Sequence, residues 1–155
     1  CRSEPGRTDR GGVIGALVAL ALFQAQPQLV LTGVGRWAIF ADAASITADG
    51  DGAVRMRSLQ VADADFTIGD KAYWGGWSWW RFDCARQTGQ RLDFASVAAD
   101  GTEGPITPVN GAPEPFAPGG DAAELAAVAC AAKPPIADAG SVAGAVRLGR
   151  AQLND

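Results

Sequence analysis

The stretch Trp77-Ser-Trp-Trp-Arg-Phe-Asp-Cys84 decides the fold, because its aromatic and small side chains favour an extended, half-buried strand. A second strand-like run, residues 91–98, follows after a short connection at residues 85–90. That connection contains polar residues and Gly89, which are typical of the loop between two antiparallel strands. Residues 77–98 are therefore predicted to form a β-hairpin.

Two more strand-like runs lie upstream of this hairpin, at residues 36–42 and 53–61. Between them stands Ala48-Asp-Gly-Asp-Gly52, a sequence rich in turn-forming residues. The connections within both hairpins are too short for crossover helices, so the strands must be antiparallel. We expect a sheet of about four to six strands.

Helical patterns follow the strands. Residues 121–131 predict a helix in which Asp121 is the N-cap and Leu125 and Val128 share one face. Residues 141–153 are either a last short helix or only a tail. The predicted class is α+β, with the antiparallel sheet packed against the C-terminal helix.

The first 25 residues have the layout of a secretory signal peptide: a basic segment, the thirteen-residue apolar run Gly11–Phe23, then small and polar residues. A helix needs ~20 residues to span a bilayer, so we expect no permanent membrane span, with a permanent anchor as the alternative. Cleavage is expected within residues 21–28. The mature protein would be periplasmic, cell-surface or secreted, with a domain at residues 29–132 and a C-terminal segment at 133–155.

Composition excludes several function classes. The chain has 13 basic residues, 17 acidic residues and no histidine. Residues 1–25 contain three of the basic and two of the acidic residues, so export would leave a more acidic chain. This charge disfavours a nucleic-acid partner, and the lack of histidine removes the common nucleophilic and zinc-dependent mechanisms. We expect no enzymatic activity, no metal and no cofactor.

The carboxylates offer little chemistry in this sequence. Two Asp-x-Asp stretches lack the further oxygen ligands of a calcium loop and are predicted to be solvated turns: Asp49 with Asp51, and Asp63 with Asp65. Asp83 is a candidate for a catalytic carboxylate pair with Asp93 or Asp42. An Asp in a strand is more often paired with an arginine, so we expect no catalysis from these residues.

The cysteines fit an exported protein. Cys1 lies ahead of the apolar run and would be lost with the predicted signal peptide, so Cys84 and Cys130 would be the pair left in the mature chain. Small domains in oxidising compartments often contain disulfides. The sequence leaves two alternatives, a disulfide or two buried free thiols.

The order of four short motifs resembles a known family. These motifs are Asp42-Ala-Ala-Ser-Ile46, Phe82-Asp-Cys84, the turn Pro118-Gly119 and the late helical Cys130. Over about residues 35–132 the chain resembles the surface-adhesin protein E-like domain of exported bacterial proteins. The resemblance implies an antiparallel sheet packed against a C-terminal helix and joined to it by a Cys84–Cys130 disulfide. It also implies adhesion, since the named member of that family binds host proteins.

The implied disulfide orients the sheet. If Cys84 faces the helix, period-two alternation places Ser78, Trp80 and Phe82 on the same side. Leu92 and Phe94 are expected to join them. The opposite side then presents a candidate binding face made of Trp77, Trp79 and Arg81.

For that candidate face, a structural role is the preferred explanation. Trp77 and Trp79 are instead covered if Trp74, a loop at 62–75, the C-terminal tail or a second subunit packs on them. The favoured hypothesis is a non-enzymatic exported domain that binds a protein or envelope component. The alternatives are a periplasmic scaffold that forms homodimers through its sheet, and a glycan or small-molecule binder that uses Trp77 and Trp79.

Overall fold

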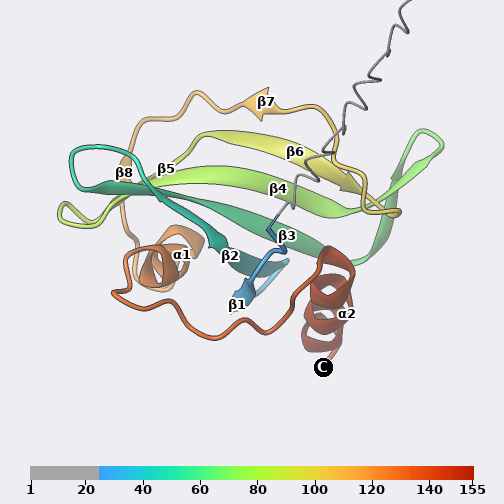
Figure 1. Cartoon of the computed structure of the whole chain (residues 1–155). Helices are drawn as coiled ribbons and strands as arrows, with labels where there is room; N and C mark the ends of the chain where they lie inside the picture. The colour runs from blue at the N-terminus through green and yellow to red at the C-terminus, as the bar shows by residue number, and fades with distance from the viewer. Residues whose placement is uncertain (1–24) are drawn as a thin grey trace, which may run out of the picture.

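The computed structural model describes residues 25–155, so the predicted signal peptide lies almost wholly outside the described residues. Figure 1 shows helices packed beside an antiparallel sheet, which confirms the α+β class. Within residues 25–155, no helix is long and apolar enough to cross a membrane. The elements are β1 (Leu29–Val34), β2 (Ala38–Ala48), β3 (Ala53–Ile68), β4 (Lys71–Asp83), β5 (Thr88–Arg91), β6 (Asp93–Ala98), β7 (Thr107–Pro108), β8 (Glu114–Pro115), α1 (Asp121–Ala129) and α2 (Val142–Leu153).

The sheet is antiparallel throughout, in the order β1-β2-β3-β4. The long strand β4 then pairs with two strands, with β6 along its first half and with β5 along its second half. The two-residue strands β7 and β8 pair with β6 and β5. Both predicted hairpins are confirmed, and β1 is an edge strand that the sequence analysis missed.

The prediction of a loop at residues 62–75 is wrong. Strand β3 continues to Ile68 and β4 begins at Lys71, so these residues form the end of a long hairpin. Gly69 has a φ of +64° in the two-residue turn, a conformation that glycine adopts without steric cost. The Gly69-Asp70 pair is the sequence signal for this turn.

A one-residue bulge separates β5 from β6. Trp80 pairs with Arg91 and Trp77 with Ala95, which leaves one extra residue on the β5–β6 side. At this bulge the Leu92 N–H donates to the Trp79 carbonyl (2.8 Å), and the Asp93 carboxylate accepts from the Trp79 N–H (2.8 Å). Neither Leu92 nor Phe94 belongs to the hydrophobic cluster under α1. Phe94 does lie on the Trp80 side of the sheet, as expected, because its ring occupies the space over Gly76 and lies 5.4 Å from the Arg91 guanidinium. The bulge at residue 92 interrupts the alternation from which the position of Leu92 was predicted.

Two hydrophobic clusters lie on opposite sides of the sheet. Neighbouring side chains of a strand point to opposite sides, and neighbouring residues of β2 belong to different clusters. Ile39 and Ala41 pack with α1, whereas Ala38 and Phe40 pack with α2. We call these two sides the α1 face and the α2 face. The α1 face contains the predicted Phe82–Trp80 side of β4, packed with the buried helix side chains of Leu125 and Val128.

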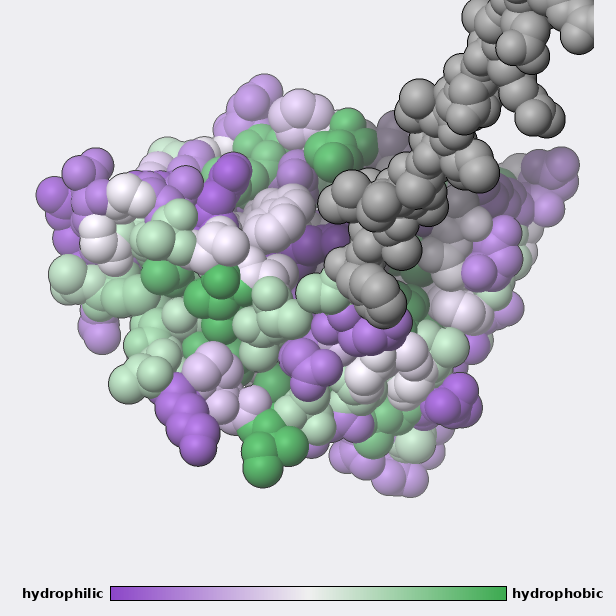
Figure 2. All heavy atoms as spheres, viewed as in Figure 1, coloured by the Kyte–Doolittle hydropathy of each residue, from purple (hydrophilic) through white to green (hydrophobic). Residues whose placement is uncertain are grey.

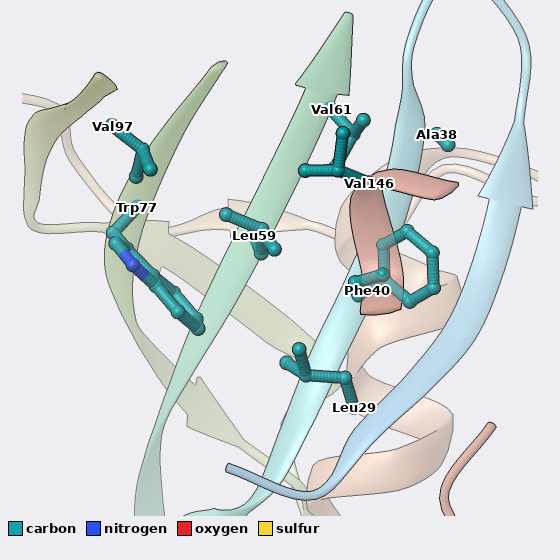
Figure 3. Packing of buried hydrophobic residues seen from close by; sticks show 9 residues of the cluster. Leu29, Ala38, Phe40, Leu59, Val61, Trp77, Val97 and Val146 are labelled. Carbon is teal, nitrogen blue, oxygen red and sulfur yellow. The ribbon is translucent and has the colours of Figure 1, made fainter. Parts of the chain in front are cut away.

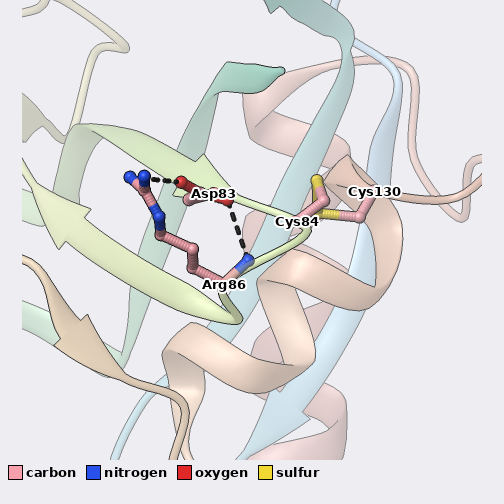
Figure 4. Close-up of a disulfide and its surroundings, with 4 residues drawn as sticks. All are labelled: Asp83, Cys84, Arg86 and Cys130. Atoms are coloured by element: carbon pink, nitrogen blue, oxygen red, sulfur yellow. Dashed lines mark hydrogen bonds and ion pairs between the residues drawn. A yellow bond between two sulfur atoms is a disulfide. The ribbon is translucent and has the colours of Figure 1, made fainter. Parts of the chain in front are cut away.

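The N-cap of α1 is Gly120, and not Asp121 as expected; Asp121 is the first helical residue. No side chain caps this end of the helix. The Cys84–Cys130 disulfide joins the end of β4 to the end of α1, as the resemblance implied. Figure 4 shows this bond beside Asp83, which accepts a hydrogen bond from the Arg86 N–H (2.9 Å) and pairs with the Arg86 guanidinium (3.4 Å).

The short helix expected at residues 141–153 forms as α2 and packs on the sheet. Figure 3 shows Val146 of α2 close to Val61 and Phe40. The preceding segment runs along β1, where Leu29 and Ala139 exchange backbone hydrogen bonds of 2.9 and 3.0 Å. Residues 133–153 therefore continue the same folded unit, and a boundary at residue 132 does not separate a tail from it.

Candidate functional site

The structure separates the three residues of the predicted binding face. Trp77 is only 4% exposed and belongs to the α2-face cluster, beside Leu59 and Val97 (Figure 3). Trp74 and α2 also contribute to this cluster. Trp77 is thus a core residue covered by its own chain, which was the alternative to a binding role.

Trp79 and Arg81 lie further along β4, beyond the part of the sheet that α2 covers. Both side chains are half-buried. Helix α2 packs on β1, β2 and β3. The uncovered end of the α2 face, which we call the open face, is formed by Arg55, Arg57, Trp79 and Arg81.

The central feature of the open face is a pair of like charges. Arg55 and Arg81 are directly opposite each other on β3 and β4. Cross-strand pairs of like charge destabilise a sheet, so a counter-charge is needed. Asp49 supplies it, with its Oδ2 at 2.9 Å from Arg81 Nε and 3.8 Å from Arg55 Nε. One carboxylate is therefore shared between two guanidinium groups.

Arg55 has unused hydrogen-bonding capacity. Its side chain is 46% exposed, and its guanidinium makes no hydrogen bond to the described residues. The neighbouring Arg81 donates through Nε to Asp49 (2.9 Å). The planar guanidinium of Arg55 is thus free to form a bidentate contact with an incoming carboxylate.

Arg57 links the open face to the core. Its guanidinium lies 4.0 Å from the centre of the Trp77 ring and 5.9 Å from that of Trp79. Its NH2 group donates to Glu103 (2.7 Å). Arg57 Nε and Trp77 Nε1 are buried without a partner among the described protein atoms. Arg57 therefore forms the boundary at which the apolar cluster ends and the charged surface begins.

The carboxylates considered for catalysis accept hydrogen bonds from backbone N–H groups. Asp42 accepts from the N–H groups of Gln28 (2.9 Å) and Ala44 (3.2 Å). Asp93 accepts at the bulge and Asp83 accepts in the turn that follows β4. The pKa of Asp100 is lowered chiefly because the backbone N–H of Thr102 donates to its carboxylate. Each of these four carboxylates thus accepts hydrogen bonds from backbone N–H groups.

Each of the two Asp-x-Asp stretches contributes one residue to the ion pairs. Asp49 pairs with Arg55 and Arg81, as above, and Asp65 Oδ1 lies 2.7 Å from Arg150 on α2. In residues 25–155, no three histidine, cysteine or acidic side chains are grouped closely enough to hold a metal ion.

Sequence reasoning missed Arg55, Arg57 and Asp49 as parts of the site. A signal was present, because Arg55 and Arg57 are two apart in a predicted strand and must share a face. What the pattern lacked was the register that sets Arg55 opposite Arg81.

Comparison with known proteins found no relative of this chain. No family model matches it, and neither does any curated protein or solved structure. The resemblance to the adhesin E-like domain therefore stays a prediction based on motif order.

Proposed function

We propose that this protein is a non-enzymatic, exported binding domain whose open face holds an acidic macromolecular partner at the cell envelope or surface. The observation that supports this proposal is the Arg55–Arg81 pair, which is opposed across two strands and shares one carboxylate. The Cys84–Cys130 disulfide is compatible with export.

Charge complementarity determines the chemistry of the partner. After residue 25 the chain has ten basic and fifteen acidic residues, yet three arginines are concentrated on the open face. Asp49 already stands between Arg55 and Arg81, so a carboxylate of the partner would bind the donors of Arg55 that Asp49 leaves unused and form charge-assisted hydrogen bonds with them. Trp79 adds an aromatic surface next to these charges, a composition typical of interface centres.

The two alternative functions are less well supported by the geometry. A glycan site that uses both tryptophans would need Trp77, whose side chain is buried in the core. Self-association through the open face would bring arginines of one copy towards arginines of another, which costs free energy. On the side of the molecule that Figure 2 shows, hydrophobic and hydrophilic residues are mixed, so this side presents no uniformly apolar surface for a second copy.

A binding measurement with a defined acidic probe tests the proposal. Fluorescence anisotropy of a labelled oligoglutamate peptide compares the protein with an Arg55→Gln/Arg81→Gln variant. An Arg147→Gln/Lys133→Gln variant, changed at two exposed positions outside the open face, is the control with the same net charge. We expect the open-face variant to weaken binding roughly tenfold and the control to change it less than about twofold, since exposed charge pairs contribute ~0.2–1 kcal/mol each.

The control makes the outcome decisive. Equal weakening by both variants would show that the peptide responds only to net charge, and the proposal would be wrong. Absence of binding to the unmodified protein at low salt would also contradict it. Capture of an envelope component by the unmodified protein, lost in the open-face variant alone, would extend the result to a natural partner.

A further inference from the structure

A cavity of about 350 Å³ lies on the α1 face, away from the open face. It is bounded by the 109–117 segment, the first turn of α1 and the paired strands β4 and β5. The positions of α1, β4 and β5 are labelled in Figure 1. Its volume is within the range of small-molecule sites, about 300–1,000 Å³. The side chains that matter for its chemistry are Trp80, Arg91, Glu114 and Asp121.

Arg91 is the only basic residue among those that line this cavity. It is half-buried and stands directly opposite Trp80 in the β4–β5 pair. Its Nε donates to Ser78 Oγ (2.8 Å), its NH2 group reaches Gln60 Oε1 at 3.5 Å, and its guanidinium lies 5.4 Å from the Phe94 ring centre. These contacts fix its orientation while leaving donors unused.

No carboxylate among the described residues lies within 4.0 Å of the Arg91 guanidinium. Burial lowers the pKa of Arg91, an effect opposed by the charges of Asp93 and Asp121. A half-buried charge without a direct partner is costly, and an anion bound in the cavity would offset that cost.

The other polar groups limit which anion fits. Glu114 and Asp121, both exposed, also line the cavity. Their negative charges repel a ligand that carries several negative groups. Their carboxylate oxygens can accept hydrogen bonds from ligand hydroxyls. The Trp80 indole donates through Nε1 to Ser58 Oγ (2.9 Å), which holds its ring in place at the cavity. Aromatic rings offer an apolar surface against which a ligand ring can pack.

We infer that this cavity binds a hydroxylated monocarboxylate of the acidic-sugar class, with its carboxylate on Arg91 and its hydroxyls on Glu114 and Asp121. The inference is independent of the acidic partner proposed for the open face. The two sites lie on opposite faces of the sheet and use different arginines.

The test uses glucuronate as the probe and records the indole N–H signals of the protein by two-dimensional NMR. Trp80→Phe assigns the Trp80 signal. We expect glucuronate to shift it in a saturable manner, with glucose and acetate each binding at least about tenfold more weakly because each lacks one of the two groups recognised. Arg91→Gln should weaken glucuronate binding by about tenfold or more, whereas Arg81→Gln on the open face should leave it unchanged.

Glu114→Gln provides a second variant at an exposed position, where loss of folding is not expected. It should weaken glucuronate binding several-fold while the thermal unfolding curve stays the same. The inference is overturned if glucuronate causes no saturable shift, if acetate or glucose binds as well as glucuronate, or if Arg91→Gln remains folded and binds normally. Loss of binding in Arg81→Gln would place the site on the other face and would equally overturn it.

Discussion

On the α1 face, a nine-residue helix packs mainly through alanines and two larger side chains, Leu125 and Val128. On the α2 face, a twelve-residue helix packs by bringing Gly149 close to Ala38 and Phe40. The first helix is additionally tied to the sheet by the Cys84–Cys130 disulfide. The second has no covalent link and depends on shape and on hydrogen bonds.

The difference shows two ways of holding a helix on a sheet. Burial of apolar area stabilises in proportion to that area, so a short helix of small residues gains little by packing alone. A disulfide compensates by restricting the unfolded chain. Helix α2 instead has the Ser141 Oγ cap, which accepts from the Gly144 N–H (3.0 Å), and Arg150, which donates to the Ala62 carbonyl (3.1 Å).

The largest expected effect tests whether both faces are true cores. Phe82→Ala on the α1 face and Phe40→Ala on the α2 face each remove a side chain with no exposed surface. Each should lower the free energy of unfolding by ~3–5 kcal/mol, measured by urea denaturation. Ile136→Ala, at a 93% exposed position, is the control with little expected change. A small loss at Phe40 alone would show that α2 covers no real core.

The next effect distinguishes the two faces by removing the disulfide, which is present on the α1 face only. Replacing Cys84 and Cys130 by serine opens a link across 46 residues and should cost about 3–4 kcal/mol in the chain-entropy model. Hydrogen exchange followed by mass spectrometry should show faster exchange in α1 than in α2. Equal acceleration in both helices would mean that the faces unfold as one unit.

A smaller effect is expected at the close contact between α2 and β2 on the α2 face. A Cβ at Gly149 would lie 2.8 Å from Ala38 Cβ and 3.1 Å from the Phe40 ring. Gly149→Val should therefore destabilise the protein by ~1–3 kcal/mol through overpacking. Gly140→Val, where a Cβ meets no atom within 4 Å, is the matched control. Thermal melts of both variants would decide, and equal melting temperatures would contradict the tight contact.

The smallest effect concerns helix capping. Ser141→Ala removes the side-chain cap of α2 and should cost ~1 kcal/mol, measured by chemical denaturation. Ser141→Asp, which retains an acceptor, should restore most of that loss. If the alanine variant is as stable as the parent, packing alone positions α2 and the contrast between the two helices weakens.

Much of the fold could be predicted from local patterns. The alternation along residues 77–84, the turn at 48–52 and the apolar spacing of 121–131 depend on neighbours in sequence, so they specified two hairpins and α1. The resemblance supplied the disulfide pairing. The bulge at Leu92 could not be predicted, since it depends on where β4 meets two different strands.

The candidate site shows the same limit in finer detail. By itself the sequence determined that Trp77, Trp79 and Arg81 share one face, because strand geometry has a period of two. Only the tertiary structure decided that Trp77 is core and Trp79 is not, because the reach of α2 and the register of β3 on β4 are set by contacts between distant residues. The same packing placed Arg55 opposite Arg81 and left Arg91 beside a cavity on the other face.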